Sequence, residues 1–170
     1  MTSEIIFQQM GMKRRIVLQV VIVFLLLLWI PVSIDKITNF ENFKTGILNQ
    51  PFSDKLGHVL VYILPGGELL TATALVSEKF RGPGLVSSCL LMSFFTGYIA
   101  IALLGAWERL PCGCGLVIRG MTWTQHFFFN LFFLFLSGWG YYLWHKLRGT
   151  SAGGGTAKGV SAKRQYKSIF

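Results

Sequence analysis

The sequence predicts an all-α integral membrane protein, a four-helix bundle, on three observations. Of the 170 residues, 52% are hydrophobic and only 14% are charged, whereas globular domains carry about 25% charged residues. Four segments are apolar over the length of about 20 residues that a membrane-spanning helix needs. No alternation of apolar and polar residues with a period of two runs through them, which argues against a β-barrel. We therefore expect one helical membrane domain, residues 1–147.

The four apolar segments differ in the polar residues they contain. They are residues 16–34, 57–77, 85–107 and 124–144. The second carries Glu68, the third has no charge and the fourth is rich in Phe. A basic stretch precedes the first segment, as in a signal peptide, but no small-x-small cleavage site follows it, so we expect an uncleaved helix. Gly97, Ala100 and Gly105 are expected to let helices approach closely.

The distribution of basic residues predicts that both termini are cytoplasmic (N-in/C-in). Eleven of the 16 Lys and Arg lie in the N-terminal flank, the second loop and the C-terminal tail, and such residues collect on the cytoplasmic side of membranes. The first and third loops then face outward. The net charge of +9 is therefore explained by basic residues on the cytoplasmic side of the membrane. It does not indicate a nucleic-acid partner, and we expect none. Residues 148–170, rich in Gly, Ser and Ala, are expected to form a flexible basic tail that touches anionic lipid.

The first outer loop is expected to contain a short amphipathic helix. Its apolar residues recur at spacings of three and four, at Ile37, Phe40, Phe43 and Ile47. The charged residues Lys36, Glu41 and Lys44 fall on other faces, and Pro51 ends the pattern. A helix of this kind lies at the membrane surface. It serves either as a packed connector, which we favour, or as a lid or partner-binding surface.

The third loop holds two cysteines one residue apart, Cys112 and Cys114. An oxidising compartment favours a disulfide there, and Gly113 permits the turn that would bring the two together. A ring this small would be strained and therefore easily reduced. Arg109 and Arg119 flank the pair, and positive charge favours the reactive thiolate. The pair suits thiol–disulfide exchange, although a structural disulfide or two idle thiols remain alternatives.

The fourth segment opens with a helix start signal and two polar residues. Thr122 and Gln125 have the spacing of a capping box. His126 and Asn130 follow one turn apart, with Trp123 on the same face. Polar side chains in a spanning helix are expected to face the bundle interior. His126 would either move protons during thiol exchange or be held by a hydrogen bond between helices.

Glu68 is an ionisable residue near the middle of the second segment, three residues after Pro65. A charge at this depth is costly and indicates a functional site. We expect its partner to be Asn130 or His126 on the fourth segment, or Thr71 one turn away. Glu68 would serve as a proton relay, as a contact to a quinone-like molecule, or only as a link between helices.

The sequence gives little support for a metal site or for several common enzyme classes. Cys112, Cys114, His126 and His58 have the ligand types of a zinc site, but their spacing matches no zinc motif. We therefore predict no metal site, and the sequence does not identify a cofactor. Cys89 is expected to be a small buried apolar side chain. No nucleotide-binding loop, HExxH motif or nucleophile elbow is present, so no enzyme class is assigned.

Together these motifs resemble the MauE/DoxX family of redox-associated membrane proteins, in particular its methylamine utilisation MauE-like branch. The resemblance rests on the four-helix plan and on three motifs: PGGEL at 65–69, PCGCG at 111–115 and TWxxHxxxN at 122–130. It covers roughly residues 13–144. The family often has CGCFG, whereas here Cys114 is followed by Gly115 and Leu116, a departure from the family pattern at this turn.

The resemblance implies a multi-pass inner-membrane protein that handles the redox state of exported proteins. The MauE branch is associated with maturation of a disulfide-rich periplasmic amine dehydrogenase subunit. By carry-over, Cys112 and Cys114 would be a periplasmic redox pair, supported by Glu68, His126 and Asn130. The partner would be a periplasmic thioredoxin-like or disulfide-containing protein. Two alternatives remain, a non-catalytic assembly factor for a secreted partner and a small-molecule carrier that uses Glu68.

Overall fold

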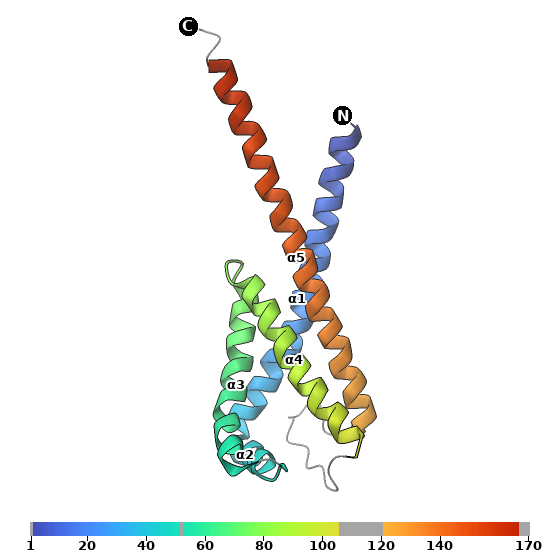
Figure 1. Ribbon diagram of the computed structural model, residues 1–170, viewed down its shortest axis with the longest axis vertical. Coiled ribbons are helices and arrows are strands. Elements are labelled where there is room, and N and C mark those ends of the chain that lie inside the picture. The colour runs from blue at the N-terminus through green and yellow to red at the C-terminus, as the bar shows by residue number, and fades with distance from the viewer. Residues whose placement is uncertain (1, 52, 106–120, 167–170) are drawn as a thin grey trace.

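The protein is helical throughout the part that the structure describes. The computed structural model describes the backbone of residues 2–51, 53–105 and 121–166, and the side chains of residues 11–51, 53–105 and 121–149. Five helices follow one another in this part of the chain (Figure 1): α1 (Thr2–Thr38), α2 (Phe40–Leu48), α3 (Asp54–Val76), α4 (Arg81–Leu103) and α5 (Trp123–Tyr166).

Four of these helices confirm the predicted membrane-spanning segments. The stretches Gly11–Thr38, Asp54–Val76, Arg81–Leu103 and Trp123–Gly149 are long and apolar enough to cross a bilayer. Large apolar side chains such as Leu70 and Phe94 are exposed on the outside of the bundle, where lipid rather than water surrounds them. The predicted four-helix membrane bundle is therefore confirmed, while its orientation stays a prediction.

The spanning helices form a closed ring of neighbours. α1 packs against α3 and α5, and α4 packs against the same two helices. α2 crosses one end of the bundle and contacts α3 and α1 (Figure 1). We call this the α2 end; α4 ends there and α5 begins there. The opposite end, where the α3–α4 turn lies and the two chain termini extend, is the terminal end.

The helices approach one another most closely at glycines near the terminal end. A Cβ added to Gly82 would lie 2.3 Å from the Trp144 ring, and one added to Gly84 would lie 2.9 Å from the Leu75 backbone nitrogen. The predicted Gly97 and Gly105 have no such neighbour within 4 Å, so that prediction is wrong for these two. Gly105 instead follows the end of α4 with a positive φ of 77°, a conformation that glycine adopts without strain.

α2 confirms the amphipathic helix predicted for the first loop, with two corrections. Phe43 is buried and Phe40 and Ile47 are half-buried, so the apolar face does pack inward. Ile37 and Lys36, however, belong to the last turns of α1, which extends to Thr38. Ile37 is exposed, whereas Lys36 is buried. The prediction that Lys36 lies away from the buried face is wrong, because α1 continues past the end of the apolar run.

At the other end of the chain, α5 runs past the predicted apolar segment 124–144 into the predicted tail. The helix continues to Tyr166, so residues 148–166 have a helical backbone. That residues 148–170 form a separate basic unit on the cytoplasmic side stays a prediction.

Candidate functional site

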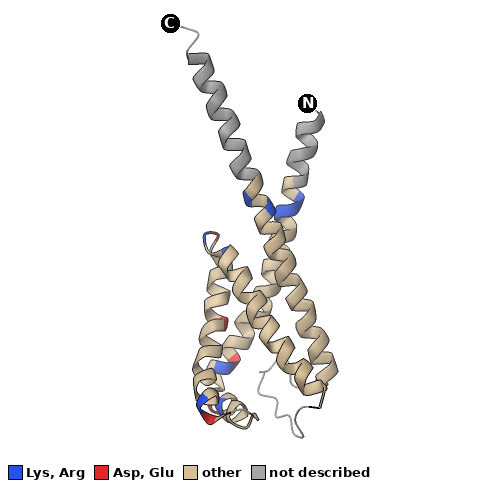
Figure 2. Cartoon of the chain, viewed as in Figure 1, with Lys and Arg blue, Asp and Glu red and all other residues tan. Residues whose placement is uncertain are grey.

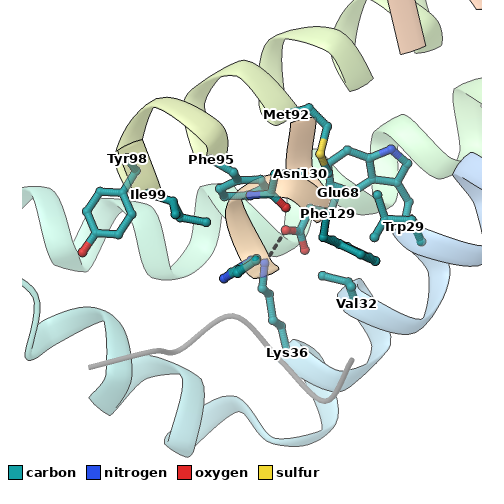
Figure 3. Close-up of a pocket in the computed structure, with 12 residues that line it drawn as sticks. Trp29, Val32, Lys36, Glu68, Met92, Phe95, Tyr98, Ile99, Phe129 and Asn130 are labelled. Atoms are coloured by element: carbon teal, nitrogen blue, oxygen red, sulfur yellow. Dashed lines mark hydrogen bonds and ion pairs between the residues drawn. The ribbon is translucent and has the colours of Figure 1, made fainter. Parts of the chain in front are cut away.

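A buried ion pair between α1 and α3 lies near the α2 end of the bundle. Lys36 Nζ donates a hydrogen bond to Glu68 Oε1 (Figure 3). Their side chains are only 4% and 0% exposed. A single buried charge is strongly unfavourable in such surroundings, whereas a paired one is tolerated. Lys36 is therefore the partner of Glu68, in place of the residues that the sequence suggested.

Aromatic rings surround the ammonium group of the pair. Lys36 Nζ lies 5.4 Å from the centroid of the Phe43 ring and 5.3 Å from that of Phe95. Both distances are in the range of cation–π attraction. Phe43 comes from α2 and Phe95 from α4. Together with α3, which carries the paired carboxylate, three helices besides α1 contact the lysine. α2 thus helps to enclose the ion pair in addition to connecting α1 and α3.

The ion pair opens onto a small cavity between the four spanning helices. Its volume is about 40 Å³, enough for about three water molecules. A drug-sized ligand needs about 300 Å³ or more, so the cavity as it stands excludes a quinone-sized ligand. Its lining is mostly apolar and comprises Leu28, Trp29, Val32, Lys36, Glu68, Met92, Phe95, Tyr98, Ile99, His126, Phe129 and Asn130.

Two polar atoms at this cavity have no hydrogen-bond partner among the described residues. They are Glu68 Oε2, an acceptor, and Asn130 Nδ2, a donor. Figure 3 shows the two side chains beside each other, coming from α3 and α5. Leaving such a buried group unpaired costs about 1–3 kcal/mol. The pair therefore fits a small molecule that both donates and accepts hydrogen bonds, such as water.

The start of α5 fixes the position of His126 beside this cavity. Thr122 N donates to Gln125 Oε1 at 2.9 Å, and Gln125 N donates to Thr122 Oγ1 at 3.3 Å. This reciprocal pair confirms the predicted capping box. His126 follows in the first turn and is 3% exposed. Its ring centroid lies 6.5 Å from that of Trp123.

The structure brings three of the five predicted site residues together. Glu68, His126 and Asn130 line one cavity, although they come from α3 and α5. Cys112 and Cys114 lie outside the described residues. Thr71, the third suggested partner of Glu68, shares a hydrogen bond of 2.7 Å with the Ser87 hydroxyl and donates to the Gly67 carbonyl.

The remaining predictions concern metals and the third cysteine. His58 is exposed on α3 and does not line the cavity. Within the described ranges, no three His, Cys, Asp or Glu residues are grouped closely enough to hold a metal ion; Cys112 and Cys114 lie outside these ranges. Cys89 is a free thiol in α4 and is half-buried, less buried than the sequence suggested.

Sequence reasoning missed Lys36, although a signal for it exists. The buried face of α1 recurs at spacings of three and four, through Leu18, Ile22, Leu25, Trp29 and Val32. The next position in this series is Lys36. Extending the period past the apolar run would have placed the lysine inside the bundle.

A hydrogen-bonded chain deeper in the bundle was missed as well. Trp29 Nε1 donates to Ser88 Oγ at 2.9 Å, and Ser88 and Ser137 share a hydrogen bond of 2.8 Å between their hydroxyls. These three side chains join α1, α4 and α5, and Trp29 also lines the cavity. Polar contacts of this kind hold membrane helices together.

Comparisons with known proteins point to one family. The family model of methylamine utilisation protein MauE matches residues 14–143. Methylamine utilization protein MauE of Paracoccus denitrificans is 28% identical over 93 residues, which are 54% of this chain and 50% of that relative. The chain thus matches half the length of that relative. No solved structure matches. Because the family match spans most of the chain and contains the whole cavity, the protein belongs to the MauE family of multi-pass membrane proteins.

Proposed function

We propose that this protein supports thiol–disulfide exchange during maturation of exported proteins, with Cys112 and Cys114 as the redox pair. Both cysteines lie inside the stretch that matches the family model. The name of the Paracoccus denitrificans relative suggests that one such exported protein is a methylamine-utilising enzyme. In this proposal the protein resides in the inner membrane, and the cysteine loop faces the periplasm.

The observation that carries the proposal is the position of the cavity with the ion pair and His126, at the end of the bundle where the segment that contains the cysteines begins and ends. α4, which precedes that segment, ends at the α2 end, and α5, which follows it, begins there. Cys114 is seven residues from Met121, and a chain of that length reaches at most about 25 Å. In this proposal the dithiol acts at the end that holds His126 and the ion pair.

The exchange needs no oxidant beyond the partner's own disulfide. The thiolate of one cysteine attacks a disulfide of the exported protein, forms a mixed disulfide and releases a partner thiolate. The second cysteine then attacks the mixed disulfide, which closes the Cys112–Cys114 bond and releases the partner as a dithiol. The partner gains two electrons and the two protons that the cysteines lose. The reverse sequence oxidises the partner.

The cavity residues have a supporting role in this proposal. His126 receives the proton of the attacking thiol and returns it to the departing one. Lys36 and Glu68 hold the end of α1 against α3, and Asn130 orders the small polar molecule that the cavity accommodates. Replacing His126 with Asn should therefore slow exchange while the free energy of unfolding changes little, which separates a proton-transfer role from a packing role.

Trapping the mixed disulfide is the direct test. Cys112→Ser and Cys114→Ser variants, each with one cysteine of the pair, should accumulate a disulfide-linked partner that non-reducing electrophoresis and mass spectrometry identify. Cys89→Ser is the matched control, because Cys89 lies within α4, and it should behave as the unchanged protein. Full restoration of a deletion strain by the double Cys112→Ser/Cys114→Ser variant would overturn the proposal and favour a non-catalytic assembly factor that still captures its partner.

A second candidate function, a carrier of a small molecule or ion, draws support from Glu68. Its Oε2 atom has no hydrogen-bond partner among the described residues. Glu68 lines a cavity that is large enough for water or a small polar solute. Proteoliposome flux that is lost in Glu68→Gln but retained in the double cysteine variant would favour the carrier. Flux that neither variant changes would exclude it.

A further inference from the structure

A second, larger cavity lies at the terminal end, on the opposite side of the bundle from the ion pair. Its volume is about 580 Å³. Three arginines from three different helices border it: Arg15 on α1, Arg81 on α4 and Arg148 on α5. Guanidinium groups bind phosphate through paired hydrogen bonds. Their convergence on one cavity therefore indicates an anionic ligand.

The cavity keeps a positive excess because its acidic residue neutralises little. Glu78 also borders it, and the Glu78 carboxylate lies 3.9 Å from the Arg81 guanidinium. The Glu78 side chain is 85% exposed, and a surface pair of this kind contributes at most about 1 kcal/mol. Three cations against one exposed anion leave the cavity basic.

One of the three arginines is held in place by an aromatic ring. The Arg148 guanidinium lies 4.9 Å from the centroid of the Trp144 ring. Trp144 borders the cavity and packs over Gly82, where no side chain intervenes. Arg81 is itself only 14% exposed. Two of the three guanidinium groups are thus ordered by the bundle before any ligand binds, which lowers the entropic cost of binding.

An apolar groove adjoins the basic cavity along α1. Its volume is about 360 Å³, and it shares Arg15 and Gln19 with the basic cavity. Its other walls are the exposed apolar side chains of Ile16, Val20, Val23 and Phe24. A ligand that fits both spaces has an anionic head and a hydrocarbon chain.

The basic cavity also lies where three candidate membrane spans begin or end, and the ends of such spans meet the lipid headgroups. Arg81 is the first residue of its candidate span, and Arg148 is next to the last residue of the span Trp123–Gly149. Arg15 lies near the start of the span Gly11–Thr38. Figure 2 shows the Lys and Arg of α1 and α5 gathered side by side at this end of the bundle.

We propose that this cavity binds the phosphate of an anionic phospholipid, with one acyl chain in the groove along α1. Basic pockets between membrane helices bind such headgroups. The inference rests on the arginines and on the groove, and it is independent of the thiol chemistry proposed for the other end.

The test compares two sets of three substitutions that remove the same charge. The full-length protein is placed in nanodiscs of phosphatidylcholine with a minor fraction of phosphatidylglycerol, and native mass spectrometry measures which lipid stays bound. Arg15→Gln/Arg81→Gln/Arg148→Gln should reduce retained phosphatidylglycerol about tenfold or more, because each charged hydrogen bond contributes strongly. The control Arg14→Gln/Lys79→Gln/Lys146→Gln removes three charges that do not border the cavity. Equal loss in both sets would overturn the proposal.

A second pair of variants tests the groove and does not depend on the arginines. Val20 and Val17 are both exposed on α1, but only Val20 borders the groove. Val20→Trp should lower retention of phosphatidylglycerol, and Val17→Trp should not. Identical retention in these two variants would overturn the acyl-chain assignment. Stabilisation of the detergent-solubilised protein by inorganic phosphate, equal to that by phosphatidylglycerol, would show a phosphate site instead of a lipid site.

Discussion

At the α2 end a lysine and a glutamate lie inside the helix packing, whereas at the terminal end three arginines border an open cavity. Lys36 and Glu68 are almost wholly buried and form an ion pair with each other. Arg15 and Arg148 are exposed, and the cavity that they share with Arg81 contains a single acid. Charged side chains thus occupy two environments, a buried one between helices and an open one at the end of the bundle.

The difference shows how a membrane bundle handles charge at two depths. Inside the bundle an ion must have a protein partner, so the Lys36–Glu68 pair behaves as one unit. At headgroup depth lipid and water supply the partner, so arginines can remain unpaired by protein. The helix packing also differs between the two ends. Aromatic side chains line the small cavity, whereas close glycine contacts lie beside the large one.

The largest expected effect follows from separating the buried pair. Lys36→Met and Glu68→Met, made singly, should each lower the free energy of unfolding by about 3–5 kcal/mol, because each leaves one buried group without its partner. The double variant should recover most of that loss. Unfolding in mixed micelles, followed by circular dichroism, measures all three values in one double-mutant cycle.

The exposed pair Glu41–Lys44 on α2 provides the matched control. Its charged atoms are 3.6 Å apart, and the Glu41 side chain is 80% exposed. Glu41→Met and Lys44→Met should cost no more than about 1 kcal/mol. If the single substitutions at Lys36 and Glu68 cost as little as these, the buried pair does not act as one unit.

A smaller effect is expected from filling a glycine contact at the terminal end. In Gly84→Ala the new Cβ would lie 2.9 Å from Leu75 N and 3.0 Å from the carbonyl carbon of Ala74. Both are backbone atoms, so α3 and α4 must move apart, at a cost of about 1–3 kcal/mol. The same unfolding assay measures the loss.

Gly97→Ala on the same helix separates packing from helix propensity. No atom lies within 4 Å of a Cβ at Gly97, so this variant should gain about 0.5–1 kcal/mol from the stiffer backbone. Equal stability of the two variants would mean that the glycine contact at Gly84 does not hold α3 against α4.

The fold was largely predictable from the sequence because membrane helices depend on local features. Apolar length identified all four spans, the spacing of Phe40, Phe43 and Ile47 identified α2, and the Thr122–Gln125 spacing identified the start of α5. Each signal lies within a few turns of one helix. None required knowledge of which helices are neighbours.

The features that were missed depend on contacts between helices. The period of α1 indicates that Lys36 is buried, but no local pattern shows that its partners are Glu68 of α3 and the Phe43 ring of α2. The 19 glycines look alike in the sequence, and helix rotation decides that Gly82 and Gly84 meet a neighbour while Gly97 does not. The cavity itself combines side chains from four helices, so only its individual polar residues could be proposed beforehand.

The smallest expected effect concerns the capping box that begins α5. Thr122→Ala removes the hydroxyl that accepts the Gln125 N–H at 3.3 Å, and loss of such a cap costs about 1 kcal/mol. The change should raise hydrogen exchange of backbone amides in the first turn of α5, around His126, and leave the amides of the terminal end unchanged. Thr122→Ser keeps the hydroxyl and should exchange as the unchanged protein does. If serine and alanine have the same effect, the threonine acts through its methyl group, and the first turn at the α2 end is held by packing instead of by its cap.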